Sequence, residues 1–311
     1  MKEEKIATRQ SFGEALEKLG ETNKNVVVLD ADLAKSTKTS LFAKKFPDRF
    51  IDVGISEQNM IGIAAGLSTF GKVPYVSTFA AFATGRVYDQ IRCSIAYPKL
   101  NVKICGTHAG ITVGEDGATH QCCEDIALMR TIPGMTVIVP SDDIEAKAAV
   151  KAAAAMEGPV YMRFGRLAVP VINDEDYKFE IGKGKVLREG TDVAIIANGL
   201  CVAESLDAAE KLAAEGINAQ VINMATVKPL DTELVLEAAK ATGKVVTVEE
   251  HSVIGGLGSA VCDVLSEQLP TPVLKIGVND VFGHSGPAVE LIKEFGLDGD
   301  SIAAKVKEFV K

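Results

Sequence analysis

HAGITVGEDGATHQ occupies residues 108–121, and the rest of the chain is arranged around this stretch. It contains two of the four histidines, an acidic pair at Glu115-Asp116 and three glycines. An apolar segment at 100–105 leads into it, and a helical pattern begins at Cys123. A long glycine-rich loop that follows a buried strand of an α/β sheet is a common place for a ligand site. The alternative is a mobile surface loop with solvated histidines.

Short apolar runs alternate with helical patterns on both sides of this loop. Val26-Val27-Val28-Leu29 is typical of a fully buried parallel strand, and the apolar spacing from Ser11 to Leu19 predicts a helix. Further strands are expected at 50–53, 73–77, 102–105, 136–139 and 160–164. Further helices are expected at 40–46, 57–69, from 78 to near 97, at 125–130 and from 142 to about 156. Ser56 and Ser141 are expected to cap the helices that follow them.

A second series of the same kind follows residues 166–189, where the periodicity lapses apart from a short strand near 185–187. Its strands are expected at 193–197, 218–223, 244–248 and 273–276. Its helices are expected at 201–215, 231–240, 258–268, 287–295 and from 301 onward. This alternation predicts an α/β protein with two three-layer α/β/α modules and mostly parallel sheets. We place the domains at 1–165 and 190–311, joined by a linker at 166–189.

The composition excludes several classes of function. The chain has 33 basic and 42 acidic residues, for a net charge of −9, which argues against a nucleic-acid or anionic-membrane partner. No apolar run approaches the roughly 18 residues of a membrane span, and the first ten residues have no apolar core typical of a signal peptide. The six cysteines show no C-x-x-C and no metal-ligand spacing. We therefore expect a cytoplasmic protein with reduced thiols.

Familiar nucleotide and hydrolase motifs are missing. There is neither a P-loop nor a G-x-S-x-G nucleophile elbow. The Gly255–Gly258 turn falls short of a dinucleotide-binding fingerprint, so close helix–strand packing is its expected role. His251 and His284 have no ligand spacing and are expected to be structural.

Three chemical features remain. Glu57 opens a helix, where a carboxylate also suits the helix dipole. Phe79 and Phe82 share a helical face and could equally belong to the core. The 108–121 loop supplies histidines and an aspartate. In a parallel sheet all three features lie at the carboxyl ends of strands, on one rim. A buried carboxylate beside an aromatic wall could hold a nitrogen heterocycle and exchange a proton with it, and neutral histidines could serve hydroxyl groups.

These residues resemble a known family along essentially the whole chain. The resemblance is to the C-terminal half of transketolase, a thiamine-diphosphate enzyme, and more narrowly to the C-terminal subunit of split transketolases. The matching motifs are ATR (7–9), DAD (30–32) with Ser36, GISEQ (54–58), STF (77–79), GEDGATHQ (114–121) and VEEH (248–251). The run G-E-D-G-x-T-H-Q is highly specific, and the others support it by order and spacing.

The resemblance implies a cofactor pocket. Glu57 matches the glutamate that hydrogen-bonds the aminopyrimidine ring and promotes its reactive tautomer. Phe79 and Phe82 match the residues that stack on the pyrimidine. Family members often carry G-x-R-E-H here, whereas Ser56 and Gln58 flank this glutamate. Many family members have a third aromatic residue in this pocket, and its position falls at about Gly85 in this chain. Arg86 is therefore expected to complete the pocket differently.

The resemblance also implies a substrate site. His120 matches a catalytic histidine at the ketose carbonyl, and Asp116 matches the residue that reads the configuration of a sugar hydroxyl. An arginine with hydroxyl and imidazole partners suits a phosphate dianion. The implied sugar-phosphate clamp consists of Arg9, Ser36, His108 and Arg163.

The diphosphate half of the family's site is missing. These enzymes hold Mg²⁺ and the diphosphate with a G-D-G motif and a later asparagine, and no G-D-G occurs in this sequence. The chain is therefore expected to need an N-terminal transketolase subunit that binds the diphosphate and Mg²⁺. The resemblance implies an α2β2 assembly, with self-association through the second domain, that moves a two-carbon ketol unit between sugar phosphates.

Two alternatives remain. The β subunit of a 2-oxo-acid dehydrogenase has the same fold, although a carboxylate substrate without phosphate does not need four clamp groups. A non-catalytic α/β assembly subunit would have kept the fold and lost the chemistry.

Overall fold

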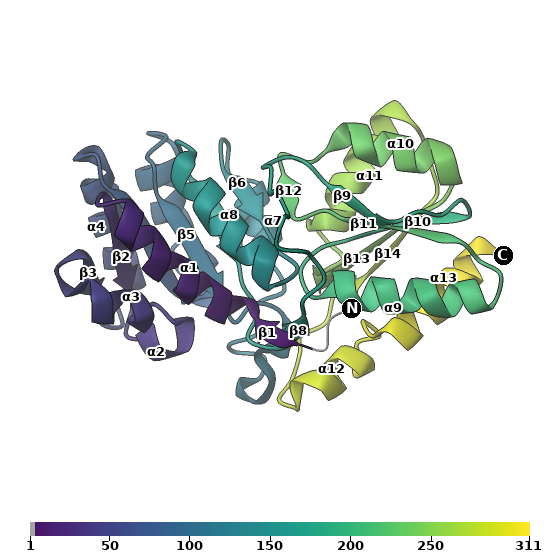
Figure 1. Cartoon of the computed structure of the whole chain (residues 1–311), viewed down its shortest axis with the longest axis horizontal. Helices are drawn as coiled ribbons and strands as arrows, with labels where there is room; N and C mark the ends of the chain where they lie inside the picture. Colours follow the sequence, from purple (N-terminus) through teal and green to yellow (C-terminus); the bar gives the residue numbers. More distant parts are fainter. Residues whose placement is uncertain (1–3) are drawn as a thin grey trace.

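Figure 1 shows two α/β domains side by side, and this computed structural model describes residues 4–311. The first sheet has the order β12 (Thr226–Lys228), β6 (Thr136–Ile138), β7 (Val160–Arg163), β5 (Lys103–Thr107), β4 (Val73–Phe79), β2 (Val26–Asp30), β3 (Phe50–Asp52). The second has the order β14 (Val273–Val278), β13 (Val245–Ser252), β10 (Val193–Ala197), β11 (Ala219–Asn223), β9 (Lys185–Arg188). Only the edge strands β12 and β9 run antiparallel to their neighbours in these two sheets. The predicted α/β architecture with mostly parallel sheets is confirmed.

Burial explains why the strands read as continuous apolar runs. Every residue of β2, β5, β10 and β11 is buried, as expected for parallel strands covered on both faces. One apolar cluster continues from the first domain into the second and includes Ile104, Ile126, Ile222 and Leu257. The two domains therefore share part of their hydrophobic core.

Helices cover both faces of each sheet. In the first domain they are α1 (Thr8–Thr22), α2 (Ala34–Thr37), α3 (Ser40–Lys45), α4 (Glu57–Thr69), α7 (Asp125–Arg130) and α8 (Asp143–Ala155). In the second they are α9 (Cys201–Ala214), α10 (Thr232–Thr242), α11 (Leu257–Gln268), α12 (Ala288–Glu294) and α13 (Gly299–Val310). Helices α1 and α8 pack together over the first sheet, and α9 packs against α13 over the second (Figure 1). Within residues 4–311, no helix combines the length and apolarity needed to cross a membrane.

The predicted cap at Ser141 is wrong, and the predicted cap at Ser56 is right in position only. Ser56 stands at the N-cap position of α4, but its side chain makes no capping hydrogen bond. The N-cap of α8 is Asp142, whose carboxylate accepts the Glu145 N–H at 2.9 Å. Ser141 instead donates its hydroxyl to the Glu145 carboxylate at 2.7 Å. A carboxylate is the stronger acceptor for backbone N–H groups at a helix start, which explains the choice.

The helix predicted from residue 78 to near 97 is interrupted. It consists of α5 (Ala80–Thr84), α6 (Tyr88–Gln90) and a π-helical segment, η2 (Ile91–Ala96). The interruption at 85–87 directs the Arg86 side chain toward the start of α4, where it contacts Glu57.

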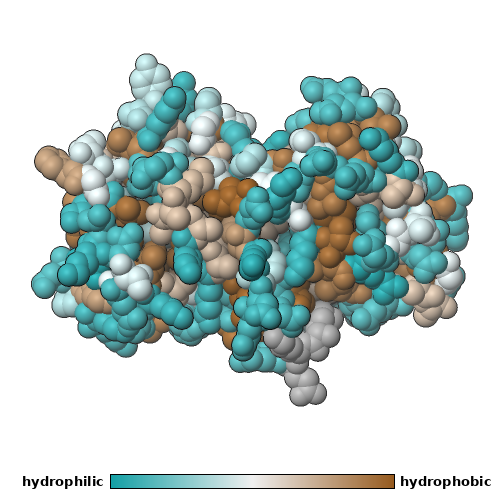
Figure 2. Space-filling model, turned by 45° about the horizontal axis from the view of Figure 1, so that its top comes forward, coloured by the Kyte–Doolittle hydropathy of each residue, from teal (hydrophilic) through white to brown (hydrophobic). Residues whose placement is uncertain are grey.

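The segment between the two domains carries strands of its own. Within it, β8 (Ala168–Pro170) pairs with β1 (Lys5–Ala7), and β9 joins the second sheet. Strand β12 comes from the second half of the chain, yet it pairs with β6 at the edge of the first sheet. The space-filling view in Figure 2 shows two lobes that meet along a groove, with apolar side chains at the surface on both sides of it. The two halves of the chain are thus joined by strand pairing and a shared core as well as by the connecting segment.

Candidate active site

The carboxyl ends of the parallel strands bring the predicted residues to one rim of the first sheet. Ser36 follows β2, Glu57 follows β3, Phe79 ends β4 and His108 follows β5. This is the edge at which open α/β sheets bind their ligands.

Aromatic rings form a continuous surface along this rim. Phe79 stacks on His108 with ring centroids 3.8 Å apart, and on Phe82 at 6.1 Å with an interplanar angle of 13°. His120 stands edge-on to Phe79 at 6.3 Å and to Phe82 at 5.5 Å. Phe79 contacts Phe82, His108 and His120, so the two phenylalanines and the two loop histidines form one cluster.

Glu57 lies at one end of this aromatic cluster. Its side chain is only 5% exposed, and Arg86 Nη1 donates a hydrogen bond to its Oε1 at 2.7 Å. The Arg86 guanidinium lies over the Phe82 ring at 4.3 Å, within range of a cation–π contact. The Arg86 side chain is 46% exposed, so a buried carboxylate is covered here by a cation that solvent can reach.

Arg9 and His108 lie at the other end. Arg9 Nη1 is 2.9 Å from both the Ser36 carbonyl oxygen and His108 Nε2. Because an arginine can only donate, Nε2 is the acceptor, and the ring proton lies on Nδ1, which donates to the Thr107 hydroxyl at 2.9 Å. Burial lowers the pKa of His108 to about 3, and the nearby charges of Arg9 and Arg166 add to this effect. His108 is therefore a neutral imidazole.

We expect the His108 ring not to titrate between pH 5 and 8 in ¹⁵N–¹H NMR spectra of the folded chain, with a His108→Gln variant used to assign its signals. Its folded pKa lies below its unfolded value, so its contribution to stability is complete above about pH 6.5 and is lost as the pH falls toward 3. His284 is the internal control, because its hydrogen bond with Glu294 raises its pKa. A His108 midpoint near 6.5 would contradict this assignment.

Asp116 ends η3 (Ile111–Asp116), and His120 follows in the next turn, where its ring contacts the aromatic cluster. Asp116 is exposed, and His120 Nδ1 is 2.9 Å from the Thr119 hydroxyl oxygen. A Cβ on Gly117, where φ is +74°, would lie 2.4 Å from the Ser285 hydroxyl oxygen. The loop is thus packed closely against the second domain. The alternative of a surface loop with solvated histidines is wrong for His108, which is 3% exposed.

Arg163 points into the protein interior. Its Nε donates to Asp125 Oδ2 at 2.8 Å, and its Nη2 donates to the carbonyl oxygens of Glu250 at 2.8 Å and Cys122 at 3.3 Å. The Tyr161 hydroxyl donates to the same Asp125 oxygen at 2.6 Å. This placement argues against the prediction that Arg163 belongs to the phosphate clamp, because its Nε and Nη2 already have acceptors and its Nη1 lies 3.9 Å from the buried Glu250 carboxylate.

Arg166 is a candidate that the sequence reasoning missed. Its Nη1 donates to the Val113 carbonyl and to Glu115 Oε2, the latter at 2.6 Å. Its charge also acts on Arg9 and His108, whose pKa values it helps to lower. The available signal was position: Arg163 ends a strand, so a residue three places later lies beyond the carboxyl edge of the sheet.

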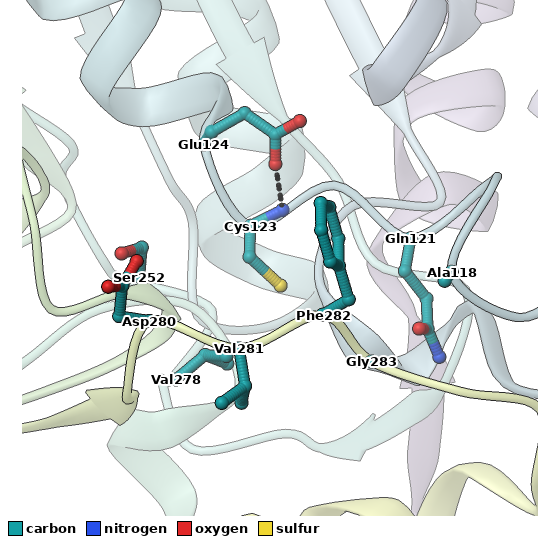
Figure 3. Close-up of a pocket in the computed structure, with 10 residues that line it drawn as sticks. All are labelled: Ala118, Gln121, Cys123, Glu124, Ser252, Val278, Asp280, Val281, Phe282 and Gly283. Carbon is teal, nitrogen blue, oxygen red and sulfur yellow. Dashed lines mark hydrogen bonds between the residues drawn. The ribbon is translucent and has the colours of Figure 1, made fainter.

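A pocket of about 300 Å³ lies between the C-terminal end of the loop and the second domain, and Figure 3 shows the residues that line it. Gln121 and Cys123 line one side, and Val278, Val281 and Phe282 line the other. The Cys123 N–H donates to the Glu124 carboxylate at 2.8 Å. The predicted site residues lie outside this pocket. Among residues 4–311, no three His, Cys, Asp or Glu side chains are grouped as metal ligands.

The Gly255–Gly258 turn packs helix against strand, as expected, because a Cβ on Gly258 at the start of α11 would lie 2.7 Å from the Thr247 hydroxyl oxygen in β13. It also packs against the first domain, where a Cβ on Gly255 would lie 2.6 Å from Ala127 Cβ in α7. His251 is fully buried and accepts the Ala127 N–H at 3.2 Å through Nε2. The predicted structural role of His251 agrees with these contacts.

The sequence matches two protein families in succession. Residues 4–171 match the transketolase pyrimidine binding domain, and residues 182–302 match the transketolase C-terminal domain. Together these matches cover most of the chain.

Individual relatives agree with this result. The chain is 54% identical over 306 residues to a Methanocaldococcus jannaschii protein provisionally named as a transketolase C-terminal section, covering 97% of this chain and 96% of that one. It is 46% identical over 300 residues to the 6-deoxy-6-sulfo-D-fructose transketolase subunit SqwH of a Clostridium species, covering 96% and 93%.

A solved structure described as a split gene transketolase, inactive beta4 tetramer, matches with a TM-score of 0.89 and 56% identity over 97% of both chains. With its pyrimidine-binding domain followed by a C-terminal domain, this chain belongs to the transketolase family and corresponds to the C-terminal section of a split transketolase.

Proposed function

We propose that this chain is the C-terminal subunit of a heteromeric thiamine-diphosphate-dependent transketolase, which transfers a two-carbon ketol group from a ketose phosphate to an aldose phosphate. The observation that carries the proposal is the aromatic cluster, which joins the buried Glu57 at one end to Arg9 and His108 at the other. Phe79 contacts both Phe82 and His108. A cofactor ring and a phosphorylated sugar would therefore share one wall.

The aminopyrimidine of thiamine diphosphate fits the Glu57 end of the site. Arg86 offers a planar, nitrogen-rich group that hydrogen-bonds Glu57 and lies on the face of Phe82. An aminopyrimidine ring offers the same two contacts, so we keep Arg86 as a residue that borders the cofactor pocket and propose that its side chain moves aside when the ring enters. Glu57 Oε1 is then the atom that shares a proton with the ring. When bound, the cofactor supplies the nucleophilic carbon that carries the two-carbon unit.

The arginine end fits a sugar phosphate. Arg9 and Arg166 bring two guanidinium groups to one corner, beside Ser36, and paired arginines suit a tetrahedral dianion. His108 accepts a hydrogen bond from Arg9 at Nε2 and donates its Nδ1 proton to the Thr107 hydroxyl, so we assign it to orienting Arg9 rather than to donating to the phosphate. His120 serves the carbonyl end of the sugar, and Asp116 serves a hydroxyl group.

One relative is named for 6-deoxy-6-sulfo-D-fructose, so a sulfonate sugar is the rival to a phosphate sugar in the proposed clamp. A sulfonate has the same tetrahedral shape as a phosphate but carries one negative charge. Two arginines favour the dianion, and we therefore assign phosphate sugars as the substrates.

A partner chain is needed to complete the cofactor site. This sequence has no G-D-G motif, so Mg²⁺ and the diphosphate are assigned to an N-terminal-half subunit. The similar structure is described as an inactive tetramer of β chains, which supports this need. We propose an α2β2 assembly in which the second domain, from about residue 190 to 311, supports self-association. The six unpaired cysteines suit the reducing cytoplasm.

The test is a ketol-transfer assay with thiamine diphosphate, Mg²⁺, xylulose 5-phosphate and ribose 5-phosphate. We expect product only when the chain is mixed with a partner that carries G-D-G, and none from either chain alone. Replacing the donor by 6-deoxy-6-sulfo-D-fructose tests the anion preference, and replacing it by pyruvate tests the oxo-acid alternative. Activity of this chain alone would refute the divided site. Association without ketol transfer would refute the transketolase assignment.

A further inference from the structure

The second domain holds the substrate loop, residues 108–121, by three separate contacts. The Ile111 side chain is buried in the apolar cluster of the second domain. The Thr112 N–H donates to Glu250 Oε1 at 2.7 Å. Gln121 Nε2 donates to the His284 carbonyl oxygen at 3.0 Å. The position of the loop therefore depends on residues more than a hundred places later in the chain.

Glu250 makes the most directional of these contacts. It lies on β13 and is 3% exposed. Thr112 is in the first turn of η3, where N–H groups have no partner within the helix, so Glu250 caps this turn from another domain. A Cβ on Gly110, where φ is +76°, would lie 2.2 Å from the Glu250 carboxylate. Only glycine allows this approach without a shift of the backbone.

Arg163 connects Glu250 to the other end of the loop. Its Nη2 donates to the carbonyl oxygens of Glu250 and of Cys122, at 2.8 and 3.3 Å. The Cys122 carbonyl also accepts the Gly110 N–H at 2.8 Å. The two ends of the loop are thus closed on each other and fastened to the same strand of the second domain.

We propose that Glu250 is a positioning residue for ketol transfer, which fixes the first turn of η3 and thereby places Asp116 and His120 against the substrate. This inference rests on the proposed function and deepens it, because it gives the second domain a part in the reaction besides self-association. Asp116 lies in the short turn that follows the one capped by Glu250, across a kink at Gly114 where φ is +82°, and His120 comes four residues after Asp116. A shift of about 1 Å at such a residue is enough to slow a reaction by roughly a hundredfold.

The surroundings of Glu250 predict a pH dependence. Arg163 faces it from β7, Asp125 from α7, Cys201 from α9 and Cys123 from the segment just after the loop. Burial raises the pKa of Glu250 to about 7, although Arg163 opposes the rise. The ionised carboxylate is the stronger acceptor for the Thr112 N–H. The loop is therefore held more firmly as the pH rises through this range.

Hydrogen exchange tests the contact in the full chain without any partner. We expect Glu250→Ala to speed exchange of the amides of residues 110–117 by roughly 10- to 100-fold, the effect of losing a hydrogen bond to a charged acceptor. Glu249→Ala is the matched control. Glu249 is the neighbouring buried carboxylate and accepts the N–H groups of Leu257 and Gly258 at 2.7 and 2.8 Å. Its loss should speed exchange at the start of α11 and leave the loop unchanged.

Kinetics of the assembled enzyme separate positioning from packing. We expect Glu250→Ala to lower kcat by roughly 10- to 100-fold while the KM for the cofactor stays near wild type. Glu250→Gln keeps an acceptor oxygen, so it should restore most of kcat and remove the limb near pH 7 from the pH profile.

Three outcomes decide the matter. Unchanged loop exchange in Glu250→Ala, or the same pattern as in Glu249→Ala, overturns the contact. Faster exchange with wild-type kcat overturns the positioning role. Absence of ketol transfer in the wild-type assembly refutes the proposed function and with it that role, while the exchange pattern still decides the contact.

Discussion

A Glu57→Gln variant is expected to lose ketol transfer by roughly 10²- to 10⁴-fold, the range for removal of a group that carries a proton in catalysis. Glutamine has nearly the same shape as glutamate, but its amide oxygen cannot share a proton with the cofactor ring as Glu57 Oε1 would. The side chain is buried at the start of α4 and has Arg86 as its ion-pair partner. Turnover of the assembled enzyme at saturating cofactor measures the effect, and native mass spectrometry confirms that the subunits still associate.

Asp143→Asn is the matched control for this experiment. Asp143 is also a buried acid in the first turn of a helix, α8, and it pairs with Lys147 at 2.8 Å. If Glu57 served only the helix dipole, both variants would lose a few tenths of a kcal/mol of stability and keep their turnover. We expect the asparagine variant to keep full activity. Full activity in the Glu57→Gln assembly would favour the alternative of a non-catalytic subunit.

An Asp125→Ala variant is expected to lose about 3–5 kcal/mol of free energy of unfolding, the cost of leaving a buried charge without its partner. Asp125 is fully buried and accepts hydrogen bonds from both Arg163 and Tyr161. Burial opposes the positive charge of Arg163, but Asp125 and Glu250 raise the pKa of Arg163 above its usual range. The guanidinium therefore stays charged. Denaturant titration followed by circular dichroism measures the loss.

Asp263→Ala is the control for a pair of the same kind at the surface. Asp263 is 72% exposed and pairs with Arg130 at 3.3 Å. Exposed pairs of this kind contribute about 0–1 kcal/mol, so this variant should remain close to wild type. Equal losses in the two variants would show that the Asp125–Arg163 pair is no more important than a surface ion pair.

The sequence was sufficient for the layout of the site because the sheet topology follows from pattern. Alternating apolar runs and helical periods predict parallel strands, and parallel strands end on one rim. Glu57, Phe79 and His108 each follow or end a different strand of this kind, so their proximity in space could be expected before any coordinates were known.

The sequence was not sufficient to predict side-chain orientations that depend on partners far away in the chain. Arg163 and Arg166 lie three residues apart on the same rim, and nothing local says which one turns inward. The choice depends on Asp125, which is 38 residues away in the chain, and on Glu250, which is 87 away. The contact between Glu250 and Thr112 spans 138 residues and has no local signal either.

Strand β12 has a consequence for how this half of the enzyme can be divided. It comes from the second half of the chain but covers the β6 edge of the first sheet. A bare strand edge is a template for pairing with foreign chains. A gene fragment that ends before residue 226 would therefore encode a sheet with an unprotected edge, and the 108–121 loop would lose its contacts with Glu250 and His284. A transketolase gene can be split before the first domain of this chain, as in the split-gene structure that matches it. The two domains of this chain, by contrast, should be kept together in any gene fusion or truncation.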